Sequence, residues 1–323
     1  MNAQAFIESR LKKMQEVPAV ISCDSKEELK KEILRLLLSK KFRKYAANED
    51  LIEHCKNAID LKVENNEPIN ITFVHGAYKL WRLEESPYAD WAELFSLMYY
   101  TNWVKNICAM YEPGVHFDFF ADDWIVPIMN NVPMSDVDDY LSSFNKLLIF
   151  LKPYQPKNLD MTITPVGTQF ESKEEFEDQL YSGLKALQND GLPELDDSDR
   201  LMIEHNVKTT PEQEADPEWR EKVRQFFLAY APVKKAAGYH YRPEKILAFT
   251  QPLPSGSTIS VGTTKSSVMK FWVGAGVLNP KNDSYVESIL SVAQLKESSF
   301  EKQEIEIEGL EGENFDSINV LSD

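Results

Sequence analysis

The chain has 323 residues, of which 43% are hydrophobic and 11% aromatic. This composition is typical of a globular protein and excludes disordered, collagen-like and coiled-coil chains. The formal charge of −17 argues against a nucleic-acid-binding protein, because affinity for the phosphate backbone comes mainly from clustered Lys and Arg. The length fits either two domains of roughly 150 residues or one large α/β domain.

The three cysteines, Cys23, Cys55 and Cys108, are an odd number, lie far apart and have no CxxC spacing. Neither a disulfide framework nor a zinc site is therefore indicated. No apolar run approaches the ~18 residues of a membrane span, and the first residues lack the pattern of a secretory signal. We expect a soluble, unprocessed protein of the reducing cytoplasm.

The first predicted element is a basic amphipathic helix over residues 25–45. Ser25 and Glu28 have the spacing of a capping box, and apolar residues recur after them at helical spacing. The other positions carry Lys30, Lys31, Arg35, Lys40, Lys41, Arg43 and Lys44. This cationic face is either solvated or in contact with an anion or a membrane surface.

Strands and helices then alternate through the first half of the chain. Short apolar segments at 69–74, 115–121 and 159–164 predict strands. Helices are predicted after them at about 88–110, at 135–151 and from Ser172 onward. The first of these helices would begin at the N-cap Ser86 and end at Pro113-Gly114. Because it is apolar on most sides, we expect it to lie against a sheet and under another layer. The alternation predicts an α/β fold with a Rossmann-like, largely parallel sheet.

The C-terminal third has a different pattern. After a helix near 217–230, strands are predicted at 246–250, 258–262 and 269–274, and we expect them to extend the sheet with antiparallel pairing. The proposed organisation is a Rossmann-like core with N-terminal helices at 1–187, an acidic insertion or linker at 188–221, strands and a helix completing the same domain at 222–295, and an acidic tail at 296–323.

The tail contains nine acidic and two basic residues, a net charge of −7. Its alternation around Ile305 and Ile307 is compatible with an edge strand, but its charge favours a solvated, partly disordered segment that is dispensable for folding.

Ligands of open parallel sheets bind beyond the carboxyl ends of the strands, where side chains from several loops converge. The loop at 75–87 follows the first predicted strand and contains His75, Lys79 and Arg82, a set that suits a phosphate or a carboxylate. The alternative is an ordinary solvated loop.

Asp122 and Asp123 follow the second predicted strand. Paired carboxylates at a strand end are typical of the divalent-metal sites of nucleotide-sugar transferases. The alternatives are a structural or capping role, and an ionised general base or amine-binding carboxylate.

The turn at 262–267 contains Lys265 and Ser266 and has the composition of a phosphate cradle, with Arg242 nearby in sequence. It lacks the order of a P-loop, so a plain hairpin turn is equally compatible. The five histidines have no metal-ligand spacing, and the chain has no G-x-S-x-G or G-x-G-x-x-G motif. Zinc hydrolases, serine hydrolases and dinucleotide oxidoreductases are therefore disfavoured.

Several short motifs occur together in residues 25–165. They are the Lys-bearing loop Gly76-Ala77-Tyr78-Lys79, the helix start from Pro87 to Glu93 with Asp90 between them, Tyr111-Glu112-Pro113-Gly114 before a strand, and a later helix with Asp138 and Tyr140. In these motifs and their order the chain resembles the isocyanide (isonitrile) synthase family of pyoverdine and dityrosine biosynthesis. It departs from that family at Ala121-Asp122-Asp123, where the family has Ser-Asp-Gly, and in the surroundings of Lys79.

The resemblance implies an enzyme that joins the amine of an amino acid, often aromatic, to one carbon of ribulose 5-phosphate and releases an isonitrile without a metal or other cofactor. It is compatible with a partner oxygenase that uses iron and 2-oxoglutarate. The alternatives are a metal-dependent glycosyl or nucleotidyl transferase that uses the acidic pair, and a non-catalytic sugar-phosphate-binding protein. The candidate catalytic residues are Lys79, Asp122 and Asp123, and the candidate substrate-binding residues are His75, Arg82, Glu93, Arg242, Lys265 and Ser266.

Overall fold

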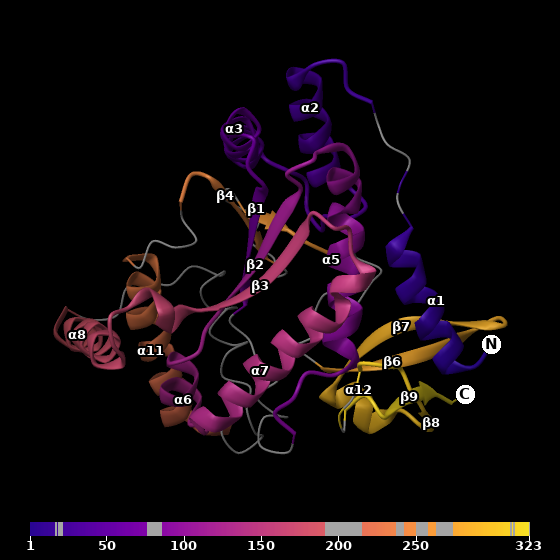
Figure 1. Cartoon of the computed structure of the whole chain (residues 1–323). Coiled ribbons are helices and arrows are strands. Elements are labelled where there is room, and N and C mark those ends of the chain that lie inside the picture. The colour runs from indigo at the N-terminus through magenta and orange to yellow at the C-terminus, as the bar shows by residue number, and fades with distance from the viewer. Residues whose placement is uncertain are drawn as a thin grey trace.

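The computed structural model describes most of the chain, and Figure 1 shows this part as two β-sheets with helices around them. The larger sheet has the strand order β3-β2-β1-β4-β5, and all its neighbouring strands pair in parallel. The second sheet has the order β7-β6-β9-β8. The described residues are 1–16, 18, 22–75, 86–190, 215–236, 242–249, 258–262, 274–310, 312 and 314–322.

The predicted α/β class and parallel sheet are confirmed. The larger sheet consists of β1 (Ile69–His75), β2 (Val115–Ala121), β3 (Leu159–Pro165), β4 (Lys245–Phe249) and β5 (Thr258–Ser260). Its first three strands agree with the sequence prediction to within one residue at each end. The helices of the first half are α1 (Ala3–Gln15), α2 (Lys26–Leu37), α3 (Glu49–Asn65), α5 (Trp91–Met110), α6 (Ile125–Asn130) and α7 (Met134–Leu151).

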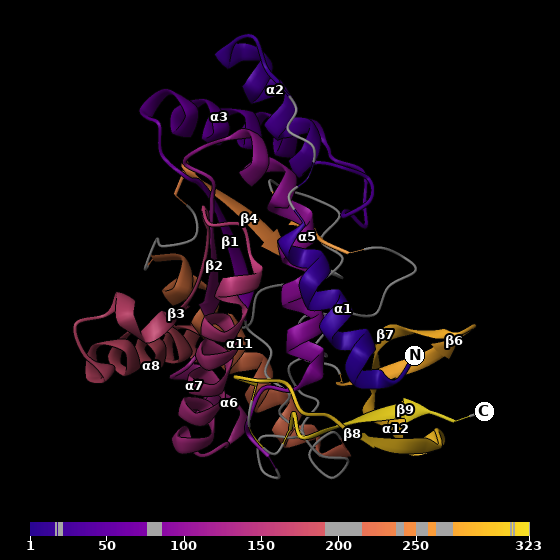
Figure 2. The same cartoon turned by 45° about the vertical axis from the view of Figure 1, so that its right-hand side comes forward.

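Helix α5 lies between the two sheets, as predicted from the apolar residues on most of its sides. It contacts β2 and β3 of the parallel sheet and β6 and β7 of the second sheet, and α1 runs alongside it (Figure 2). Aromatic side chains fill the space between α5 and the parallel sheet. The ring centroids of Tyr100 and Phe117 are 5.0 Å apart, and those of Phe73 and Tyr100 are 5.2 Å apart. Such aromatic pairs add to the free energy of burial, so this interface forms a rigid base for the strand ends.

The cap of α5 differs from the prediction. The helix begins at Trp91, and its N-cap is Asp90 rather than Ser86. The Asp90 side chain accepts a hydrogen bond from the Ala92 N–H at 2.6 Å, and the Glu93 carboxylate accepts one from the Asp90 N–H at 2.7 Å. This capping box satisfies two backbone donors that a helix start leaves without partners, which explains why Asp90 prevails.

The basic helix α2 starts where Ser25 predicts, with the Ser25 hydroxyl accepting a hydrogen bond from the Glu28 N–H, but it ends earlier than expected, at Leu37. Three of its cations, Lys26, Lys30 and Arg35, are paired with acids. Lys30 Nζ lies 2.7 Å from a carboxylate oxygen of Glu64 on α3, and Arg35 Nε lies 2.7 Å from one of Glu32. These pairs favour a solvated, partly neutralised face for α2.

The late strands differ from the expected antiparallel extension. β4 pairs with β1 in parallel, and β5 pairs with β4 in parallel. The antiparallel pairs occur in the second sheet, where β6 (Gly274–Lys281) pairs with β7 (Ser284–Ser291) and β8 (Phe300–Glu304) pairs with β9 (Ser317–Leu321). Residues 269–273 of the predicted third strand lie outside the described residues.

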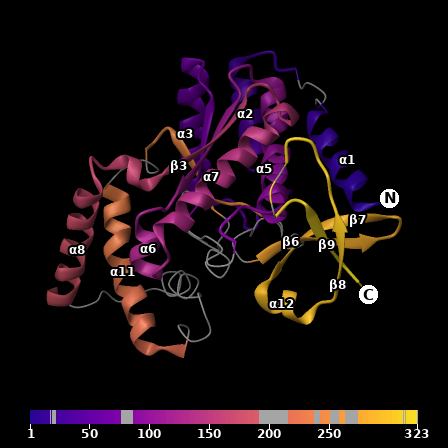
Figure 3. The ribbon, with the colours of Figure 1, turned by 60° about the horizontal axis from the view of Figure 1, so that its bottom comes forward.

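The expectation of a solvated acidic tail is wrong. After the short helix α12 (Val292–Glu297), the chain forms β8 and β9, and β9 pairs with β6 in parallel. Figure 3 shows these two strands beside β6 and β7, as part of the second sheet. Its large apolar residues are buried, namely Ile305, Ile307, Leu310, Phe315, Ile318 and Val320. Their burial outweighs the repulsion among the acids, and the acids of this segment that the structure describes are exposed.

The predicted acidic insertion at 188–221 starts at the end of α8 (Lys173–Asp190) and finishes in the first turns of α11 (Pro217–Ala236). Residues 191–214 lie outside the described residues. The two helices pack side by side at one edge of the molecule (Figures 1 and 3). Among the described residues, no helix combines the length and the hydropathy needed to span a bilayer.

Candidate functional site

The carboxyl edge of the parallel sheet brings the ends of β1 and β2 together. The Asp122 N–H donates a hydrogen bond to the His75 carbonyl at 3.0 Å, which continues the β1–β2 pairing one residue beyond the strands. Two predicted site residues from different loops are therefore fixed beside each other by the backbone. This is the edge at which parallel α/β sheets bind their ligands.

His75 is buried, with 1% of its surface exposed. Its ring contacts three aromatic rings edge-on, at centroid distances of 6.4 Å to Phe119, 6.0 Å to Tyr140 and 5.4 Å to Phe144. His75 thus packs between β2 and α7. A substrate-binding role for this side chain stays a prediction.

Glu93 is fully buried at the start of α5. Besides the Asp90 N–H, its carboxylate accepts a hydrogen bond from the Tyr140 hydroxyl of α7 at 3.1 Å. The positive end of the helix dipole also stabilises a carboxylate in this position. These contacts give Glu93 a structural role in the cap. They also join it, through Tyr140, to the ring of His75.

Asp122 is also buried, and the Tyr230 hydroxyl of α11 donates a hydrogen bond to its Oδ1. The sequence analysis did not single out Tyr230. Only the helical spacing of buried residues around it, from Val223 to Val233, marks that face of α11 as part of the core. Its pairing with Asp122 depends on tertiary packing across 108 residues of chain.

Asp123 binds the loop after β3. Its Oδ1 accepts a hydrogen bond from the Gly167 N–H at 2.9 Å, in the short helix η2 (Val166–Gln169). Burial raises the pKa of the Asp123 carboxyl, the N–H groups of Trp124 and Gly167 oppose this shift, and the nearby charge of Asp122 adds to it. A Cβ atom at Gly167 would lie 2.6 Å from Asp123 Oδ2, so this close approach requires glycine. These contacts support the structural alternative for Asp123.

The hydrogen bonds of β3 extend this anchoring. Asp118 is buried in β2, and its Oδ1 accepts hydrogen bonds from the Thr162 hydroxyl at 3.2 Å and the Thr164 hydroxyl at 2.7 Å. Side-chain bonds from Asp118 and Asp123 therefore fix the end of β3 to β2. The carboxyl edge is held rigidly on this side of the sheet.

Four of the predicted cationic and hydroxyl residues lie outside the described residues: Lys79, Arg82, Lys265 and Ser266. Their segments leave the described chain at His75 and at Gly262, after β1 and β5. Arg242 lies elsewhere. It is exposed just before β4, whose first residue pairs with Asn70 near the start of β1, so the structure places Arg242 at the amino edge of the sheet.

In the part of the chain that the structure describes, the two carboxylates of the acidic pair have separate hydrogen-bond partners. Asp122 and Asp123 are held by different neighbours, the Tyr230 hydroxyl and the Gly167 N–H. Among the described residues, no three His, Cys, Asp or Glu side chains are grouped so that they could hold a metal ion. These contacts do not favour the binding of one divalent metal ion by both carboxylates, which the transferase interpretation requires.

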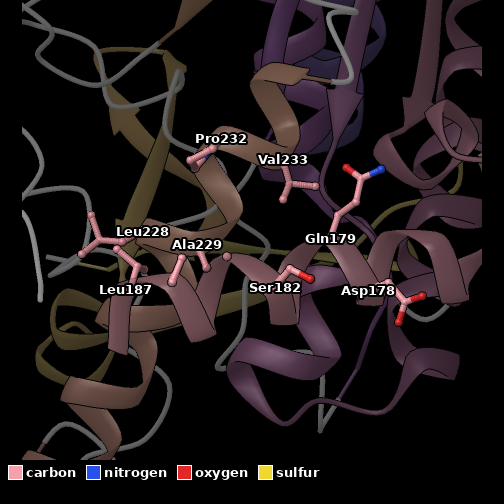
Figure 4. A pocket seen from close by; sticks show the side chains of 10 residues that line it. Asp178, Gln179, Ser182, Leu187, Leu228, Ala229, Pro232 and Val233 are labelled. Carbon is pink, nitrogen blue, oxygen red and sulfur yellow. The ribbon is translucent and has the colours of Figure 1, made fainter. Parts of the chain in front are cut away.

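A groove of about 640 Å³ lies between α8 and α11 (Figure 4). Its walls are mainly apolar, with Leu187, Leu228 and Val233 among them, and Asp178 lies at one end. No Lys or Arg is among the described residues that line the groove, and a carboxylate disfavours an anion. It therefore does not suit a sugar phosphate, and the carboxyl edge of the sheet remains the candidate site.

Comparison with known proteins adds a structural relationship. No family model matches the chain, and no curated protein matches its sequence. Among solved structures, the crystal structure of the PvcA protein from Pseudomonas aeruginosa is similar, with a TM-score of 0.62 and 16% sequence identity. The match covers 91% of this chain and 100% of PvcA. At this identity the likeness shows a shared fold, and it extends well beyond residues 25–165.

Proposed function

We propose that the chain is an isonitrile-synthase-like enzyme that condenses the amine of an amino acid with a ketose phosphate such as ribulose 5-phosphate. The observation that carries the proposal is the position of Asp122, a buried carboxylate at the end of β2 that is held by the His75 backbone and by Tyr230. The motif resemblance in residues 25–165 and the fold shared with PvcA support this class of function.

Asp122 is the proposed acid-base group for the first step. Its carboxylate takes a proton from the substrate ammonium, and the free amine then attacks the ketose carbonyl carbon. The protonated Asp122 returns the proton to the carbinolamine hydroxyl, which leaves as water while the C=N bond forms. Water is the sole by-product of this step.

Lys79 and Arg82 follow β1, and Lys265 and Ser266 follow β5. We propose that these residues bind the phosphate and the carboxylate of the two substrates. Arg can form two parallel hydrogen bonds to such anions, and Lys supplies a compact charge. The proposal does not use Arg242, because it lies at the opposite edge of the sheet. It also leaves Glu93 in the cap of α5, and Asp123 in the anchor of the loop after β3.

A ligand-binding panel tests the proposal. Ribulose 5-phosphate, amino acids, nucleotide sugars and manganese are each added to the protein, and the unfolding midpoint is measured. A ligand at 100 times its Kd stabilises the folded state by ~2.7 kcal/mol. Stabilisation by both ribulose 5-phosphate and an amino acid, lost or reduced in Asp122→Asn but kept in Asp160→Asn at the amino edge, supports the proposal. Stabilisation by manganese and a nucleotide sugar alone would favour the transferase.

A further inference from the structure

Tyr230 belongs to the C-terminal half of the chain and contacts the candidate site at Asp122. It lies on α11, is 5% exposed, and donates its hydroxyl hydrogen to Asp122 Oδ1. Its ring packs edge-on against Phe176 of α8, with the centroids 6.1 Å apart. The ring and the hydroxyl of Tyr230 thus have separate partners. The ring packs in the interface between α8 and α11, and the hydroxyl binds the carboxylate of Asp122.

The phenol hydroxyl of Tyr230 fixes the plane of the Asp122 carboxylate. One carboxylate oxygen accepts its hydrogen bond, and the helix that carries Tyr230 is held in place by α8 and α6.

We infer that Tyr230 is a positioning residue for Asp122, and that its hydroxyl orients this carboxylate toward the amine substrate. The inference deepens the proposed function and rests on it for the identity of the substrate. The contact itself does not depend on that function. Anchoring of α11 does not require the hydroxyl, because α11 also packs against α8 and α6.

The direct test observes the Asp122 carboxyl group in the full-length protein without ligand. Side-chain carboxyl signals of carbon-13-labelled aspartate are recorded by NMR, and Asp122→Asn identifies the signal. In Tyr230→Phe the chemical shift of this signal should change, because the hydrogen bond to Oδ1 is lost. The matched control is Tyr111→Phe, which removes a buried hydroxyl that donates to the Glu67 carbonyl at 2.6 Å. It should leave the signal unchanged. An unchanged signal in Tyr230→Phe overturns the inference.

A second modification covers the case in which Tyr230→Phe does not fold. Incorporation of 3-fluorotyrosine at position 230 keeps the ring size and makes the hydroxyl a stronger donor. The carboxyl signal of Asp122 should then change its chemical shift. A signal that stays in place contradicts the inference.

A double-mutant cycle of Tyr230 and Asp122 tests the effect on function, and the measured quantity is the affinity for an aromatic amino acid. Tyr230→Phe should weaken its binding by about tenfold in the parent and by less than about twofold in Asp122→Asn, because the hydroxyl acts through the carboxylate. Equal losses in both backgrounds would mean that Tyr230 acts only on the packing of α11. If no amino acid binds the parent protein, the proposed function fails, while the NMR signal of Asp122 still decides the role of Tyr230.

Discussion

The Trp91 indole N–H donates a hydrogen bond to the carbonyl of Ser317 at 2.8 Å, which ties the first residue of α5 to the last strand of the chain. The Trp91 ring also packs edge-on against Phe315, with the centroids 5.2 Å apart. The segment after α12 therefore supports the helix start that contains Asp90 and Glu93. Acidic composition alone does not make a segment dispensable.

Deletion of residues 298–323 should lower the unfolding midpoint strongly, because it exposes the apolar side of β6 and removes both contacts of Trp91. The single substitution Ile318→Ala should cost about 2–5 kcal/mol, the range for truncating a buried Ile. Chemical denaturation measures both effects. Glu308→Gln, an exposed position in the same segment, is the control. A deletion variant with the parent's midpoint would contradict the observed packing.

Gly167→Ala should destabilise the loop after β3, because the added Cβ would lie 2.6 Å from Asp123 Oδ2 and 2.6 Å from the Trp124 ring. We expect a loss of about 1–3 kcal/mol in the free energy of unfolding. The control is Gly183→Ala in α8, where the nearest neighbouring atom, the Ala229 carbonyl oxygen, is 3.4 Å away. That change should be neutral or stabilising, because Ala favours helix. Equal effects at the two glycines would show that Asp123 and Trp124 move aside.

Lys245 predicts a pH dependence of stability. Burial lowers the pKa of its ammonium from 10.5 to about 8, against the opposing charge of Asp118. Below pH 8 the folded state bears the full cost of the buried charge, and this cost disappears as the pH rises from about 8 to 10.5. Lys245→Met should therefore raise the free energy of unfolding at pH 7, on the order of 1–3 kcal/mol, and by less at pH 10. Denaturation at the two pH values measures this, with the exposed Lys157→Met as control. An equally large increase in the free energy of unfolding at pH 10 would contradict the lowered pKa of Lys245.

The strands at the candidate site could be predicted from sequence because their information is local. Phe117 and Phe119 alternate with other residues in a short segment between a Pro-Gly turn and two acids, and β2 has the predicted bounds. The cap of α5 was predicted at the wrong residue, Ser86. Asp90 is the N-cap, because Glu93 three residues later completes a capping box with it.

Long-range pairing accounts for what the sequence did not predict. Ile318 and Val320 are apolar residues in a segment rich in acids. Their burial depends on pairing with β6, about 40 residues earlier in the chain. The contact between Tyr230 and Asp122 likewise depends on how α11 packs against α8 and α6. Neither relationship has a local sequence signature.

Lys79 and Arg82 belong to residues 76–85, and their role stays a prediction from sequence. Lys79→Met and Arg82→Gln should each weaken the binding of ribulose 5-phosphate by ~1.5–3 kcal/mol, the range for a hydrogen bond to a charged group. Stability should change little, because the following helix has its own cap at Asp90. Calorimetry with the two variants and with Lys157→Met as control measures this. Parent-like affinity in both variants, or unfolding of either, would show that the loop is structural.

The most direct test of the proposed function is product formation. The protein is incubated with amino acids and ribulose 5-phosphate labelled with carbon-13 at each position in turn, and mass spectrometry follows the label into an isonitrile. We predict that one labelled carbon appears on the amino-acid nitrogen, that Asp122→Asn abolishes the product, and that Asp160→Asn retains it. Binding of both substrates by the folded protein without any labelled isonitrile would contradict the account.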